Sequence, residues 1–205
     1  MASCSSRRAA GVAAAALASS VWSAGAHAWI LTLNPGPTQI FMAVGNTAVP
    51  AANVATVNTV SVNVPTGSIG NGVALAMTSN STQGASPYDN YPVCNPPAQV
   101  YIGGYYRQPN SGSGAAAATL QVTTPASLSN GTNSIAFSQI SWTSTANGDS
   151  AADIAPGTFN GGTQLLANFA RNTFVENCFT YSYANATVPP AGTYTGVAVF
   201  TLSVP

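Results

Sequence analysis

The chain ends in Pro190-Ala191-Gly192-Thr193-Tyr194-Thr195-Gly196-Val197-Ala198-Val199-Phe200-Thr201-Leu202-Ser203-Val204-Pro205, its strongest sequence pattern. A Pro-x-Gly turn precedes a run with apolar residues on both faces of an extended strand. Val197 and Val199 fall on one face, and Ala198, Phe200, Leu202 and Val204 fall on the other. A strand that is apolar on both faces is usually central in a sheet or covered by a partner. We therefore expect a covered β-strand over residues 194–204.

The remaining sequence repeats this alternation in shorter runs and nowhere sustains a helical period. Turn residues separate the runs, which is typical of antiparallel sheets. The candidate strands are residues 38–44, 60–64, 73–77, 99–106, 119–123, 134–142 and 179–183. Residues 164–170 fit either a strand or a single helical turn. The pattern predicts an all-β fold, a sandwich or a barrel of about eight or nine antiparallel strands.

The N-terminal residues 1–28 resemble a secretory signal peptide. Arg7 and Arg8 precede an apolar stretch over residues 9–22, and Ala26-His27-Ala28 fits cleavage before Trp29. The apolar stretch is shorter than the roughly 20 residues that cross a bilayer. We expect an exported protein without a membrane span, located in the periplasm, at the cell surface or outside the cell. Ser6-Arg7-Arg8 leaves both the general secretory and the twin-arginine routes open.

Residues 29–205 are expected to form one β-sandwich domain, which is long enough for a substantial core. Asn110-Ser111-Gly112-Ser113-Gly114 predicts a flexible loop inside this domain, or alternatively a domain boundary.

Charged side chains are scarce after the predicted cleavage site. There is no Lys, the sole His is His27, and two arginines against four acids give a net charge of about −2. This chain has no basic face for nucleic acid or anionic lipid, so we expect neither partner. The charged residues that remain are Arg107, Arg171, Asp89, Asp149, Asp153 and Glu176.

This inventory argues against an enzyme. Ser-His and Ser-Lys nucleophiles need a base that the mature chain lacks, and two distant cysteines do not form a zinc site. We expect no cofactor and no metal. A carboxylate-based hydrolase stays open as an alternative, since four acids are present. Asn147, Asp149 and Asp153 form either an oxygen-rich calcium loop or, as we favour, a polar surface loop.

Two cysteines, Cys94 and Cys178, remain after cleavage. In an oxidising compartment an even pair predicts a disulfide. Closing a loop of about 85 residues would stabilise the fold by roughly 4 kcal/mol in the chain-entropy model. The alternative is two separate buried thiols.

Five tyrosines gather within a short stretch that ends at Arg107. Tyrosine combines a flat apolar ring with a polar tip, which suits both sugar stacking and protein contacts. These residues are therefore candidate ligand contacts, and a glycan is a candidate partner. The alternative is that alternate tyrosines line the core. The set comprises Tyr88, Tyr91, Tyr101, Tyr105, Tyr106 and Arg107.

The terminal block resembles the C-terminal end of bacterial chaperone–usher pilus subunits and of spore-coat-U-like secreted proteins. Both share a Pro-x-Gly-x-Tyr turn that leads into a final alternating strand, and Gly192 is the fourteenth residue from the end. Residues 135–142, together with Tyr183-Ala184-Asn185 and the terminal block, also resemble uncharacterised exported proteobacterial proteins.

The pilus resemblance implies an immunoglobulin-like sandwich that lacks one strand. A periplasmic chaperone, and then the next subunit, would supply that strand at an open edge. The candidate assembly strand comprises Gly192, Tyr194, Val197, Val199, Phe200 and Leu202. We therefore expect a non-enzymatic surface protein, a structural or adhesive subunit. The alternatives are a complete monomeric sandwich, a carbohydrate-binding module and a carboxylate-based hydrolase.

Overall fold

The computed structural model describes residues 31–46, 58–109, 117–145 and 152–204, which form antiparallel strands and two single-turn 3-10 helices. The all-β sandwich expected from the sequence is confirmed. The predicted signal peptide at residues 1–28, the Gly/Ser loop at residues 110–114, Asn147 and Asp149 lie outside the described residues.

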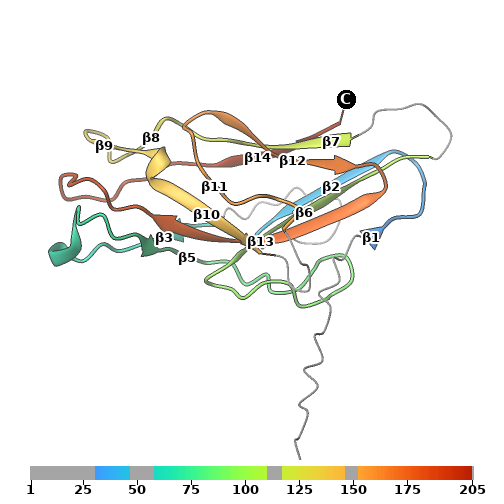
Figure 1. Ribbon diagram of the computed structural model, residues 1–205, viewed down its shortest axis with the longest axis horizontal. Helices are drawn as coiled ribbons and strands as arrows, with labels where there is room; N and C mark the ends of the chain where they lie inside the picture. The colour runs from blue at the N-terminus through green and yellow to red at the C-terminus, as the bar shows by residue number, and fades with distance from the viewer. Residues whose placement is uncertain (1–30, 47–57, 110–116, 146–151, 205) are drawn as a thin grey trace, which may run out of the picture.

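The larger sheet forms the lower layer in Figure 1, and β13 and β6 lie at its centre. β1 and β4 pair with the two ends of β13. All these pairings are antiparallel. The hydrogen-bonded strand order of the larger sheet is β11 (Gly157–Thr158), β10 (Ile140–Thr145), β13 (Thr173–Tyr183), β6 (Val100–Arg107) and β2 (Gln39–Val44), with β1 (Leu31–Thr32) and β4 (Leu75–Ala76) outside this path.

A three-stranded sheet forms the upper layer, with β7 at its centre (Figure 1). Its strands are β12 (Thr163–Ala170), β7 (Ala117–Thr123) and β14 (Val199–Ser203). Two two-stranded sheets complete the described strands, namely β3 (Val60–Ser61) with β5 (Thr78–Ser79) and the hairpin of β8 (Ser127–Ser129) with β9 (Ser134–Ala136). The 3-10 helices are η1 (Thr66–Ser68) and η2 (Phe137–Gln139).

Aromatic side chains fill the space between the two sheets. The Trp142 ring stacks on Phe179 with centroids 5.5 Å apart and tilts against Phe159 at 4.8 Å. The indole nitrogen of Trp142 donates a hydrogen bond of 3.0 Å to the Ala155 carbonyl, so its polar group is satisfied. A Cβ at Gly157 would lie 2.6 Å from the same ring, so only glycine allows this approach.

Strand β6 is buried on both faces, and its sequence, VYIGGYYR, leaves only Arg107 half-buried. Val100, Ile102 and Tyr106 point into the core between the sheets. Tyr101 and Tyr105 point to the outer face of the larger sheet, where they join two smaller apolar clusters. A strand that is apolar on both faces is usually central in a sheet, and β6, between β13 and β2, is such a strand.

The C-terminal strand differs from our expectation in both length and position. It spans Val199–Ser203 and, among the described strands, pairs only with β7, which places it at an edge. Leu202 is buried, whereas Val197 and Val199 are 62% and 53% exposed. The covered strand expected over residues 194–204 is therefore shorter than predicted, and only one of its two apolar faces is covered within this sandwich.

Two further expectations are resolved by the structure. Residues 134–142 do not form one strand, because η2 interrupts them and turns the buried Phe137 into the core. Residues 164–170 lie within β12, so the strand alternative holds there.

Removing a ring from the central aromatic group should destabilise the fold strongly. Phe179 is fully buried, and Phe179→Ala should lower the free energy of unfolding by about 3–5 kcal/mol because a cavity replaces the ring. Chemical denaturation of the mature protein measures this change. Leu165→Ala is the control, since Leu165 is 56% exposed and should change stability little. A small effect for Phe179→Ala would contradict the assigned core.

Candidate functional site

The five clustered tyrosines are separated by strand alternation and do not form one surface patch. Tyr101 and Tyr106 are 0% exposed and Tyr105 is 9% exposed. Their burial does not fit the candidate role of surface ligand contacts and supports the alternative that tyrosines line the core, because alternate residues of β6 face two buried layers. Tyr88 and Tyr91 precede β6 and are 50% and 41% exposed, so they alone of the five present large ring surfaces to solvent.

Arg107, the remaining member of the predicted set, lies at the end of β6. Its guanidinium donates a hydrogen bond of 2.8 Å to the side-chain oxygen of Gln39 on β2. Arg107 thereby links two neighbouring strands.

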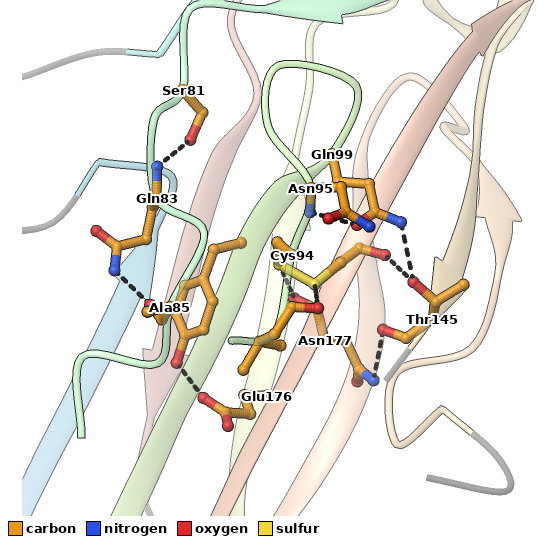
Figure 2. Close-up of a disulfide and its surroundings, with 12 residues drawn as sticks. Ser81, Gln83, Ala85, Cys94, Asn95, Gln99, Thr145, Glu176 and Asn177 are labelled. Carbon is orange, nitrogen blue, oxygen red and sulfur yellow. Dashed lines mark hydrogen bonds between the residues drawn. A yellow bond between two sulfur atoms is a disulfide. The ribbon is translucent and has the colours of Figure 1, made fainter. Parts of the chain in front are cut away.

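Residues 84–94, here called the anchored loop, cover the outer face of the larger sheet (green, below β6 and β13 in Figure 1). The predicted disulfide between Cys94 and Cys178 of β13 is confirmed, with Cα atoms 5.5 Å apart. Figure 2 shows this disulfide and its surroundings. The Tyr88 ring packs on Phe174 of the same strand with centroids 5.0 Å apart. The anchored loop is therefore fixed to the central strand β13 at two residues, Cys94 and Tyr88.

A tight turn at residues 86–91 forms the tip of the anchored loop. The Ser86 amide donates to the Tyr91 carbonyl at 2.7 Å, and the Asn90 amide donates to the Ser86 carbonyl at 3.0 Å. The Tyr91 amide donates to the Asp89 carboxylate at 2.9 Å. Asn90 has φ 63, a left-handed conformation that asparagine tolerates. The turn presents Tyr88, Asp89 and Tyr91 to solvent.

Under the anchored loop, Tyr101 binds the carboxylate of Glu176. Its hydroxyl donates a hydrogen bond of 2.8 Å to Glu176, and Figure 2 draws this contact. Gly103 faces Glu176 across the strands, and a Cβ there would lie 2.4 Å from the Tyr101 hydroxyl oxygen. Because Gly103 has no side chain, the Tyr101 phenol can extend past it along β6 to the Glu176 carboxylate on β13. Burial, followed by the negative charge of Glu176, raises the pKa of Tyr101 above its ordinary value.

The described acids have separate roles. Glu176 accepts a hydrogen bond from the Tyr101 hydroxyl, and Asp89 accepts one from the Tyr91 amide within the exposed turn. Asp153 lies exposed in the segment before β11. Asp89 also contributes to the raised pKa of Tyr101, which places Asp89 and Glu176 on the same side of the larger sheet. Within residues 31–46, 58–109, 117–145 and 152–204, no three His, Cys, Asp or Glu side chains group as a metal site.

A second candidate surface lies where edge strands β2 and β14 run beside each other. Ile40 of β2 belongs to the strand face that points between the sheets, yet it is 46% exposed. Met42 and Val44 on the same face and Phe200 of β14 are half-buried against the core. We call this surface the open seam. Neither β2 nor β14 contains a charged residue or a proline.

The sequence predicted both strands of the open seam but not their edge positions. Residues 38–44 match β2 within one residue. Which strands are outermost depends on pairings between distant segments, and alternation within a strand carries no signal of this.

Searches against protein-family models, curated proteins and solved structures returned no match for this chain. In the described part of the chain, no helix has the length and apolar character needed to cross a membrane.

Stability at high pH should depend on the buried tyrosines. The pKa of Tyr101 and that of Tyr181 are raised above about 10, the value in an unfolded chain, mainly by burial. The folded protein therefore retains protons that the unfolded chain loses. Their contribution to stability is complete below about pH 10 and is lost as the pH rises further.

Urea unfolding between about pH 8 and pH 11 measures this dependence. Tyr101→Phe should make the alkaline loss of stability shallower than in the parent protein. Tyr88→Phe, which removes an exposed hydroxyl, serves as the control and should retain the parent slope. An identical slope for all three proteins would contradict the assignment.

Proposed function

We propose that this protein is an exported, non-enzymatic structural or adhesive subunit that assembles by β-strand addition. The observation that carries this proposal is the open seam, where β2 and β14, each paired with one strand only among the described strands, flank partly exposed core residues. A strand placed there would pair with edge main-chain groups and cover apolar side chains at the same time.

The edges of the sandwich differ in how well they are protected. Proteins usually blunt an edge with a charge, a proline, a bulge or a very short strand. β11 has only two residues, and β12 contains a bulge between Leu165 and Ala167. β2 and β14 have six and five residues, and the structure assigns no bulge to their pairings. The open seam is therefore the side best suited to receive a strand.

The side chains at the open seam favour an extended apolar partner. Ile40, Met42 and Val44 recur at alternate positions along β2, and Phe200 of β14 lies on the same inner side. An added strand with apolar residues at alternate positions would extend the core over them. We infer that the occupant is an extended segment of another copy of this chain, for which a periplasmic chaperone strand substitutes before assembly.

Two other observations support an exported structural role. The disulfide is suited to an oxidising compartment, which agrees with the signal peptide expected at residues 1–28. Among the described acids, Glu176 bonds to Tyr101, Asp89 bonds within the anchored loop and Asp153 lies in an exposed segment, and the mature sequence supplies no His or Lys as a general base. The pilus resemblance of the terminal block agrees with the same role.

A charge in the open seam should block assembly. The parent protein, exported in a bacterial host and isolated from the periplasm, should occur in complexes larger than one chain. Ile40→Lys should leave it monomeric, because a strand added there would bury the ammonium group. Light scattering coupled to size exclusion measures the mass of each species.

Leu165→Lys is the matched control, since Leu165 is similarly exposed but lies on the bulged β12. This variant should assemble like the parent. A parent protein that stays monomeric at all concentrations would overturn the proposal, and so would assembly of Ile40→Lys at the parent level.

A further inference from the structure

We propose that the turn at residues 86–91 binds a neutral saccharide, with the exposed face of the Tyr88 ring as the stacking surface. This site goes beyond assembly, because a single chain contains it and it lies on the outer face of the larger sheet, away from the open seam. The proposal depends on how Tyr88 is held, on the rigidity of the turn and on the polar groups beside the ring.

Tyr88 is both exposed and held in place. Its ring packs on Phe174 with centroids 5.0 Å apart and an interplanar angle of 34°, while half of the side chain remains accessible. Phe174 in turn packs against Tyr105, whose ring stacks on Phe41 at 5.5 Å. Tyr88 therefore rests on a chain of aromatic contacts while half of the residue stays accessible to a ligand.

The backbone below Tyr88 is fixed as well. The turn is closed by the bonds between Ser86, Asn90 and Tyr91, and an isolated bridge joins Ala85 to Pro92. The disulfide at Cys94 attaches the end of the anchored loop to β13. A ligand that binds here would not have to order the loop first, so little conformational entropy is lost on binding.

The groups around Tyr88 match the apolar face and the polar edge of a sugar ring. The C–H face of a pyranose is apolar and packs on an aromatic ring, whereas its edge carries hydroxyls that need hydrogen-bond partners. Asp89 and Tyr91 lie on the same short turn, and both residues are exposed. Their chemistry allows the carboxylate to accept, and the phenol to accept or donate, hydrogen bonds.

The negative charge at the turn favours neutral saccharides over anionic ones. The turn contains Asp89 and no basic residue, and Glu176 lies below the same loop. Anionic sugars would meet the negative charge of Asp89 on this turn, which disfavours them. Tyrosine rings also suit protein contacts, so a protein partner is the alternative outcome that the test below separates from sugar binding.

The test uses the full mature protein and soluble oligosaccharides of glucose, galactose, mannose and N-acetylglucosamine, with a sialylated trisaccharide for comparison. Calorimetric titration gives each Kd. At least one neutral sugar should bind more tightly than the sialylated one. Tyr88→Ala should weaken that binding about tenfold or more by removing the stacking surface. Tyr88→Phe keeps the ring and should stay within about threefold of the parent.

Two controls separate this proposal from structural damage and from assembly. Val188→Ala alters an exposed side chain outside the turn and should bind sugar as the parent does. Ile40→Lys should be monomeric yet retain sugar binding, so the two proposals can fail independently. Circular dichroism of Tyr88→Ala checks that the fold is kept.

The absence of binding by any neutral sugar would overturn the proposal. Equal affinity in Tyr88→Ala, or a preference for the sialylated sugar, would do the same. Loss of a protein contact in Tyr88→Ala without any sugar binding would instead assign the turn to a protein partner.

Discussion

The burial of β6 on both faces is the constraint on which the rest of this structure depends. The strand pairs with β13 on one side and β2 on the other, so its main chain is satisfied within the sheet. Its side chains then require an apolar cover above and below. Gly104 allows the close pairing with β2, because a Cβ there would lie 2.4 Å from the Phe41 carbonyl oxygen. The smaller sheet supplies one cover, and Leu33 with the anchored loop supplies the other.

The outer cover explains features that would otherwise look unrelated. The Cys94–Cys178 disulfide and the packing of Tyr88 on Phe174 both attach the anchored loop to the larger sheet, and the hydrogen bond between Tyr101 and Glu176 joins β6 to β13 beneath it. A loop held at two places can keep an aromatic ring exposed without collapsing around it. The same requirement that buries Tyr101 and Tyr105 thus leaves Tyr88 as a rigid surface residue.

The sequence predicted those features that depend on local pattern. Alternation located most strands, including β2 and β7, and the even cysteine count predicted the disulfide. The position of each strand in its sheet was not predictable, because it depends on long-range pairing, and the two-faced pattern at residues 194–204 therefore misled us about β14. The tyrosines were misassigned for a related reason: proximity in sequence says nothing about which sheet face each ring reaches, whereas alternation along β6 sends Tyr106 inward and Tyr101 outward.

The lack of charge on β2 and β14 also determines how a contact formed there would respond to its surroundings. Ionic strength screens attraction and repulsion between charged side chains, and neither strand has any. Association at this surface would be governed by water release and main-chain hydrogen bonds, so dilute salt would leave it nearly unchanged. Salts excluded from protein surfaces, such as sulfate, would strengthen it. A contact of this kind would persist equally in fresh water and in brine.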